Sequence, residues 1–492
     1  MTKKSIYQLP EDQIEALLRA NAKSESIERP YGITWKHATA TLNSNNPIED
    51  ANAQLILRQN PKGKAKVSPG DLLFFAVMDG HAGPHTSRLL SKALIPAVAL
   101  ELSTLDQPST ERRSLEPSNY SALTYLKSTL HYLGSLLPAS ISPFAHIPSE
   151  DPKYVQLAIQ TAFANLDSEI VNAPIRVLEM LQANAGSLKP WEHPMAEASM
   201  LPALSGSCAL LAVLDTARRD LHVAVTGDSR AVAGYWEEDV NGEGKWRVEV
   251  LTEDQTGRNV NEYQRMVAEH PPEEASFVIQ RGRVLGGLEP TRAFGDSNYK
   301  WPREADILAP ASWICVPQVS YQPQDTPLRD QSTCHYSTRA PFPDTPNQKQ
   351  RSGSKSNLRF LVLATDGLWD ELSSSEVVSL VGAYFNGRRG NVSKSDLAKS
   401  VFTPAETAGI EGKSTESKAK QGSTEGEWAF VDENVGTHLI RNAFGGADRE
   451  KLHQLLSIPA PYSRRYRDDI TVTVVWWEPN EQNREAKVKA KL

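Results

Sequence analysis

The chain has 492 residues, of which 39% are hydrophobic and 23% charged, and its formal net charge is −7. This composition is typical of a globular protein with a substantial core. The acidic balance argues against nucleic acid as a partner, because phosphate backbones are bound by clustered Lys and Arg. Three cysteines without a Cys-x-x-Cys spacing argue against a disulfide framework or a thiolate zinc site and favour a reducing compartment. No apolar run approaches the length of a membrane span.

Helices and strands are mixed along the chain. Apolar periodicity predicts helices over 10–22, 86–102, 120–136 and 154–181. Strands are predicted over 53–59, 71–78, 207–215, 221–228, 360–366 and 470–477. Hairpins without regular strand–helix alternation predict an α+β layered domain.

The domain boundaries follow from composition. We expect an N-terminal extension over 1–35, one domain over 36–478 and a charged tail over 479–492. The polar stretches 322–357 and 386–426 are predicted to be loop insertions without a core. The N-terminus lacks the apolar stretch of a secretory signal and carries acids that presequences avoid, so it suits a cytosolic protein or one whose targeting segment is missing from this chain.

Aspartates stand at the ends of several apolar strands. Asp79, Asp228 and Asp366 each end such a run, and Asp468 and Asp469 directly precede another. In an antiparallel sheet the start of one strand lies beside the end of its neighbour, so these acids can meet at one edge. Crowded carboxylates repel unless a cation neutralises them, and hard oxygen ligands favour Mg²⁺ or Mn²⁺. The alternative is that each Asp only starts a turn.

Six motifs in order resemble the protein phosphatase 2C family. They are VMDGHAG (77–83), SGSCALLAVLD (205–215), VTGDSRAVAG (225–234), RAFGD (292–296), LATDGLWDELSSSEVV (363–378) and YRDDITVTVV (466–475). The resemblance covers about residues 40–476. It implies an α-β-β-α sandwich, in which helices flank two antiparallel sheets and a metal site lies at one edge between the sheets.

The resemblance also implies roles for individual residues. Asp79 and the Gly80 carbonyl, with Asp366 and Asp468, would hold two Mg²⁺ or Mn²⁺ ions, Asp79 bridging both. Glu49 and Asp50 match an acidic pair that acts through metal-bound waters, and Asp228 matches a ligand of a third, weaker ion. Two cations that share a water would activate it for attack on a phosphoserine or phosphothreonine. His81 would protonate the leaving oxygen; a His after Asp-Gly is otherwise an ordinary turn residue.

Some residues have simpler interpretations. Arg292 and Asp296 are expected to be structural, in a salt bridge that orders their loop, and Trp369 is expected in the core. Arg464, Arg465 and Arg467 are taken for a solvated face, with phosphate binding as the alternative.

Asn45 stands where many family members have a phosphate-binding arginine. With PIED (47–50) and the segments 9–21, 283–301 and 437–443, it resembles the mitochondrial branch that dephosphorylates pyruvate dehydrogenase. That resemblance implies a phosphoserine substrate on the dehydrogenase E1 component, a location in the mitochondrial matrix, and the complex core or a regulatory subunit as partner. The substrate phosphate would be held by the metals and Asn45. The alternatives are a phosphoprotein phosphatase of broader specificity and an inactive scaffold; another two-metal hydrolase, such as a nuclease, is disfavoured by the acidic balance.

Overall fold

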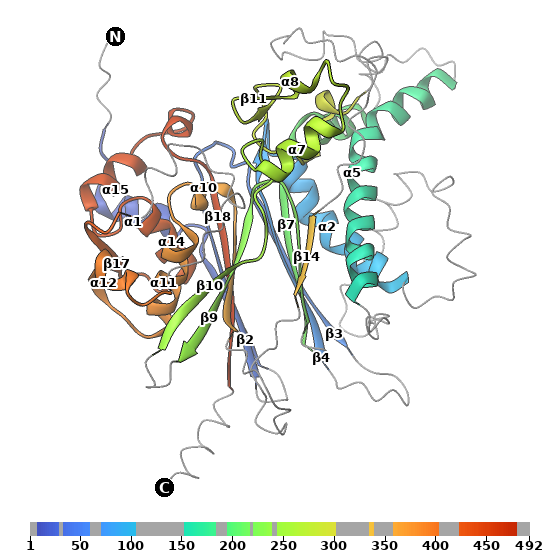
Figure 1. Ribbon diagram of the computed structural model, residues 1–492. Helices are drawn as coiled ribbons and strands as arrows, with labels where there is room; N and C mark the ends of the chain where they lie inside the picture. Colours follow the sequence, from blue (N-terminus) through green and yellow to red (C-terminus); the bar gives the residue numbers. More distant parts are fainter. Residues whose placement is uncertain are drawn as a thin grey trace, which may run out of the picture.

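A computed structural model describes residues 7–28, 33–59, 70–104, 152–183, 194–216, 220–238, 244–301, 334–338, 358–402 and 423–479. Four layers of secondary structure lie side by side: helices, a first sheet, a second sheet, and helices again (Figure 1). This is the α-β-β-α sandwich expected from the sequence. The helix predicted over 120–136 lies outside the described residues.

Both large sheets are antiparallel. The first has the order β1 (Lys23–Glu28), β2 (Ile33–Leu42), β18 (Ile470–Pro479), β15 (Leu358–Ala364), β9 (Arg230–Glu238) and β10 (Gly244–Val250). The second has the order β14 (Cys334–Thr338), β8 (Asp220–Thr226), β7 (Ala209–Asp215), β4 (Gly70–Met78) and β3 (Ala51–Gln59).

Strand β4 is covered on both faces, which explains its unbroken apolar sequence. Leu73, Phe75 and Val77 pack in the cluster between the two sheets. Phe74 and Ala76 pack in a second cluster with α2 (His85–Thr104) and α5 (Pro152–Ala183). Because successive side chains of a strand point to opposite faces, a central strand of a four-layer fold needs apolar residues at every position.

Helices cover the outer face of the first sheet (Figure 1), among them α1 (Glu11–Arg19), α10 (Asp366–Trp369), α11 (Ser374–Phe385), α14 (Val435–Ala443) and α15 (Arg449–Leu456). Ile14 and Leu18 of α1 are buried in this layer, and β1 forms the edge of the sheet. The described part of 1–35 therefore packs as part of the domain and does not extend from it. Trp369 is buried here, as expected.

The two expected loop insertions contain structured elements. In 322–357, β14 pairs with β8 through the backbone. In 386–426, β16 (Gly390–Ser393) and α12 (Lys394–Ala398) are ordered, and Leu397 is buried with α11 in the outer layer. An edge strand needs backbone partners and no apolar pattern, so composition alone did not reveal these elements. Residues 403–422 lie outside the described part.

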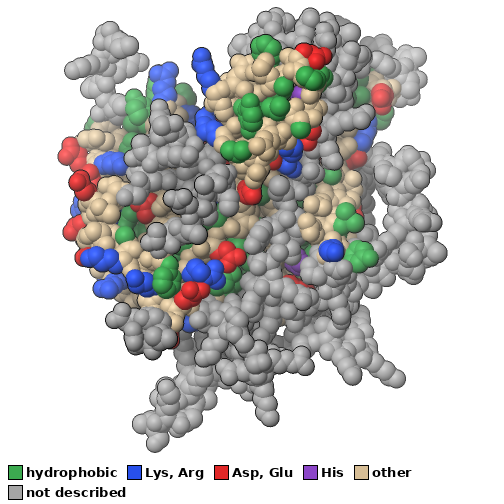
Figure 2. Space-filling view, viewed as in Figure 1, with side chains coloured by type: hydrophobic (Ala, Val, Ile, Leu, Met, Phe, Trp, Pro, Cys, Tyr) green, Lys and Arg blue, Asp and Glu red, His purple; other side chains and the backbone are tan. Residues whose placement is uncertain are grey.

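Shorter elements complete the described chain. The helices among them are α6 (Ala196–Leu204), α7 (Val260–Ala268) and α8 (Ala275–Val278). The strands are the two-stranded ribbon of β11 (Ile279–Gln280) and β12 (Arg283–Val284), the small sheet of β5 (Gly80–His81), β6 (Gly206–Ser207) and β13 (Phe294–Gly295), and β17 (Glu427–Phe430), the partner of β16. Hydrophobic side chains are visible on the surface of the α7–α8 segment (Figure 2), where Val260, Tyr263 and Phe277 are exposed. In the described helices, none combines the length and apolar character needed to cross a membrane.

Candidate active site

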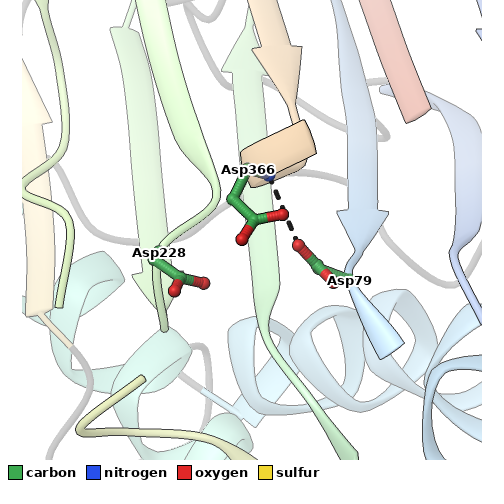
Figure 3. A group of neighbouring side chains, drawn as sticks. All are labelled: Asp79, Asp228 and Asp366. Atoms are coloured by element: carbon green, nitrogen blue, oxygen red, sulfur yellow. Dashed lines mark hydrogen bonds between the residues drawn. The ribbon is translucent and has the colours of Figure 1, made fainter. Parts of the chain in front are cut away.

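Three aspartates from different strand ends meet between the two sheets. Asp79 directly follows β4, Asp366 follows β15, and Asp228 lies in the connection by which the chain crosses from β8 to β9. One carboxylate oxygen of each lies within 4.8 Å of the corresponding oxygen of the other two. Figure 3 shows the three side chains pointing toward a common space, and the backbone N–H of Asp366 donates to Oδ2 of Asp79 (3.3 Å). The structure thus brings together acids that are far apart in sequence.

Two further acids lie near this cluster. Asp468 precedes β18, the neighbour of β15, and its charge acts on Asp366. Asp50 is buried; its Oδ2 accepts a hydrogen bond from the Thr365 hydroxyl (2.9 Å), whereas its Oδ1 has no partner among the described residues. Because buried polar atoms are normally paired, this oxygen fits a water or a cation at the site.

The cluster is electrostatically unfavourable as a set of anions. Burial and the neighbouring charges of Asp79, Asp469 and Asp468 raise the pKa of Asp50 well above its usual range. Burial, then Asp79, raises the pKa of Asp228 to about 8. Burial also raises the pKa of Asp468 to about 7. Divalent cations relieve such repulsion, and an all-oxygen donor set fits Mg²⁺ or Mn²⁺.

Asp469 organises the loop that carries the acidic pair. Its Oδ1 accepts hydrogen bonds from the backbone N–H groups of Ser44 (2.5 Å) and Asn45 (2.9 Å), and its Oδ2 accepts one from that of Glu49 (2.9 Å). The side-chain amide of Asn45 donates to Asp469 Oδ2 and to Glu49 Oε2, both at 3.0 Å. Both N–H bonds of that amide are therefore used inside the protein. A contact of Asn45 with substrate phosphate stays a prediction.

Gly80 allows the end of β4 to approach this loop. A Cβ at position 80 would lie 2.1 Å from the carbonyl oxygen of Glu49, so only glycine fits. On the other side, Oε1 of Glu49 accepts a hydrogen bond from the backbone N–H of Gly83 (2.6 Å). Glu49 is thereby fixed beside Asp79 and Gly80, whose roles as metal ligands stay predictions.

His81 is paired with Asp296. The small sheet β13–β6–β5 brings the RAFGD segment beside the DGH segment, and Nε2 of His81 lies 2.7 Å from Oδ2 of Asp296. Gly206 lies between them; a Cβ there would be 2.0 Å from Nε2 of His81. Burial opposes protonation of His81, but the charge and hydrogen bond of Asp296, with other nearby carboxylates, raise its pKa to about 9. The contact with Asp296 thus favours the protonated imidazole, and the role of His81 as proton donor stays a prediction.

Arg292 and Asp296 act separately. Arg292 forms an ion pair with Glu262 of α7 (2.8 Å), which anchors the RAFGD segment as expected. Asp296 instead forms an ion pair with His81. Asp296 and Asp469 were not predicted from the sequence as site residues. Only the adjacency of Asp469 to Asp468, and of Asp296 to a motif of the resemblance, gave a signal.

An arginine also reaches the cluster. Arg464 lies in the 3₁₀ helix Tyr462–Arg465 and forms an ion pair with Asp468. Its side chain is 47% exposed. This contact differs from the solvated face expected for the arginines of 464–467.

Comparisons with known proteins define the class. The family model described as Protein phosphatase 2C matches residues 166–413, about half of the chain. A "[Pyruvate dehydrogenase [acetyl-transferring]]-phosphatase 1, mitochondrial" from Saccharomyces cerevisiae is 34% identical, over 96% of this chain and 74% of that protein. The chain belongs to the protein phosphatase 2C family, and its activity is that of a metal-dependent protein serine/threonine phosphatase.

Relatives from animals bear similar names. A "[Pyruvate dehydrogenase [acetyl-transferring]]-phosphatase 1, mitochondrial" from Rattus norvegicus is 30% identical, over 95% of this chain and 83% of that protein. A crystal structure of a serine-threonine phosphatase 2C from Toxoplasma gondii covers 93% of this chain and 99% of its own, with 17% identity and a TM-score of 0.43.

Proposed function

We propose that this phosphatase removes phosphate from a phosphoserine of the pyruvate dehydrogenase E1 component, in mitochondria. The support is the similarity to yeast and rat proteins of that name across 95% or more of the chain. The proposed location is the matrix, and the proposed partners are the phosphorylated E1 component and the dehydrogenase complex core or a regulatory subunit.

We infer that the acidic cluster holds two Mg²⁺ or Mn²⁺ ions, with a third bound more weakly. Asp79 and the Gly80 carbonyl, with Asp366 and Asp468, would be direct ligands. Glu49 and Asp50 would act through water, and Asp228 would bind the third ion. The observation that supports this is the meeting of Asp79, Asp228 and Asp366 within 4.8 Å, together with the unpaired buried oxygen of Asp50.

When bound, the ions supply charge neutralisation at the phosphoryl oxygens and a nucleophilic water. The chain's own contribution is to hold the acids together at one point and to fix the proposed proton donor. Asp296 holds His81 protonated and directs its imidazole, so that a proton is available for the serine oxygen as the P–O bond breaks. The loop fixed by Asp469 keeps Glu49 and Asp50 in place.

The test is hydrolysis of phosphoserine E1 by the full chain with Mn²⁺ or Mg²⁺, compared with an unrelated phosphoserine protein at equal concentration. A kcat/KM at least about tenfold higher for E1 is expected from specific recognition. Equal rates on both substrates would favour the broader phosphoprotein phosphatase. No hydrolysis of either by the folded, metal-loaded chain would favour the inactive scaffold. Asp366→Asn is the control that ties the activity to the acidic cluster.

A further inference from the structure

Arg464 is a cation joined to the acidic cluster and accessible from solvent. Its Nη1 pairs with Oδ2 of Asp468, and its side chain is 47% exposed. Burial lowers the pKa of Arg464, but the charges of Asp468, Asp366 and Asp79 raise it more. The guanidinium therefore lies close enough to the cluster for three of its carboxylates to act on it.

The position of Arg464 is fixed by the loop at the site. The Ser463 hydroxyl donates to the backbone oxygen of Ser44 (2.5 Å), and the Ser44 hydroxyl donates to that of Arg467 (2.6 Å). Arg467 in turn donates from Nη1 to the backbone oxygen of Asn43 (2.5 Å). Three hydrogen bonds thus tie the segment 463–467, which contains Arg464, to Asn43 and Ser44 at the start of the acidic loop.

Asn45 offers no amide N–H to a substrate in this arrangement. Both of its side-chain N–H bonds point to carboxylates, Glu49 and Asp469, and carboxylates only accept. The side-chain oxygen of Asn45 can only accept hydrogen bonds, and its partial negative charge repels a phosphate dianion. A guanidinium, by contrast, offers five N–H donors in a plane and forms charge-assisted hydrogen bonds with phosphate oxygens.

We propose that Arg464, and not Asn45, binds the phosphate group of the substrate, with one edge of its guanidinium held by Asp468 and the exposed part directed at a phosphoryl oxygen. The assignment rests on the proposed function, in which the acidic cluster is the phosphatase site. It makes Arg464 a substrate-binding residue beside the acidic cluster.

The rival role is a structural one, in which Arg464 only orients Asp468 through an ion pair four residues apart. The two roles differ in what they affect. A phosphate-binding residue changes the KM for a phosphopeptide and the inhibition constant of inorganic phosphate. A residue that only orients Asp468 changes the concentration of Mn²⁺ needed for half-maximal activity.

The experiment compares Arg464→Ala, Arg464→Lys and Arg465→Ala in the full chain with saturating Mn²⁺ and a phosphoserine peptide. Arg465 is a matched control: it lies in the same 3₁₀ helix, is exposed, and forms no ion pair with any described residue. For Arg464→Ala we expect KM and the inhibition constant of inorganic phosphate each to rise about tenfold or more. For Arg464→Lys both constants should lie between those of the unchanged chain and of Arg464→Ala. For Arg465→Ala both should stay within about twofold of the unchanged chain.

Unchanged KM and phosphate inhibition in Arg464→Ala, with a raised Mn²⁺ requirement, would overturn the proposal and leave the structural role. If circular dichroism shows that Arg464→Ala does not fold, Arg464→Lys decides, with a rise of about threefold expected and no rise contradicting the proposal. If the unchanged chain hydrolyses nothing, the proposed function has failed. Calorimetric binding of inorganic phosphate to the Mn²⁺-loaded chain and to Arg464→Ala then still tests Arg464, with equal affinities overturning its role.

Discussion

His81 and Asp296 are 215 residues apart in sequence, and Nε2 of the first lies 2.7 Å from Oδ2 of the second. The pair exists because β6 lies between the two segments, and because Gly206 of β6 leaves room for both side chains. A carboxylate in this position stabilises the imidazolium and fixes the direction of its proton. If His81 is the proton donor, as proposed, it acts together with Asp296 as a dyad.

Substituting Asp296→Asn should lower kcat on a phosphoserine peptide by about 10- to 100-fold, because His81 loses the charge that keeps it protonated. Because the pKa of His81 is raised to about 9, the imidazole is protonated below that pH and loses its proton as the pH rises through it. The alkaline decline of kcat should therefore move to lower pH in the variant. Rates on p-nitrophenyl phosphate, whose leaving group needs no proton, should fall less. An unchanged pH–rate profile would contradict the dyad.

Replacing Asp366 with Asn should have opposite effects on stability and activity. It removes one charge from a repelling cluster, so the chelator-treated variant should unfold at the same or a higher temperature than the unchanged protein. Mn²⁺ should raise the melting temperature of the unchanged chain and raise that of the variant much less. Activity should fall by about a hundredfold or more. Differential scanning fluorimetry with and without Mn²⁺ checks the first two statements; equal Mn²⁺ stabilisation would exclude Asp366 as a ligand.

The metal-free protein should lose stability as pH rises from about 4 to about 8. Burial raises the pKa of Asp228 to about 8 and of Asp468 to about 7, from an ordinary value of 3.8. The folded state then binds more protons than the unfolded state in this range, so deprotonation favours unfolding. Urea midpoints in EDTA at several pH values measure the effect. The slope should be shallower in Asp228→Asn, and a stability that rises over this range would contradict the assignment.

Asn45→Ala should weaken Mn²⁺ binding more than substrate binding. The variant loses the two hydrogen bonds that hold Glu49 and Asp469, which costs about 1–3 kcal/mol because both partners are charged. We expect a higher Mn²⁺ concentration for half-maximal activity and a KM for phosphopeptide within about twofold of the original. A large rise in KM alone would restore Asn45 as a phosphate-binding residue.

Gly80→Ala should abolish activity through packing alone. The added Cβ would overlap the carbonyl oxygen of Glu49, so the acidic loop must shift away from Asp79. Gly387→Ala is the matched control, because its Cβ would have no neighbour within 4 Å. Its positive φ of 77° should cost about 1 kcal/mol of stability without loss of activity. Equal activity in both variants would show that the close approach at Gly80 is dispensable.

The sequence pattern predicted an α+β layered domain and most of the acidic cluster, and the family resemblance implied the α-β-β-α sandwich. Strands buried on both faces have unbroken apolar runs, so β4, β7, β8, β15 and β18 could be read from the local pattern. The aspartates that end or precede such runs were visible for the same reason. The strands β1, β2, β9, β10 and β14 were not predicted, and backbone pairing with neighbouring strands is what places them in the sheets.

Only the tertiary structure decided which polar side chains contact one another. Asp469 lies beside Asn45 because β18 pairs with β2, and Asp296 lies beside His81 because the β13–β6–β5 sheet joins their segments. The same pairing of β18 and β2 brings Arg464 to the acidic loop. These partners are hundreds of residues apart, and local propensity or periodicity carries no information on strand order. A strand that is buried must be apolar along its own sequence, so burial can be read locally. Which polar groups meet depends on how the sheets pack as a whole, which no single strand shows.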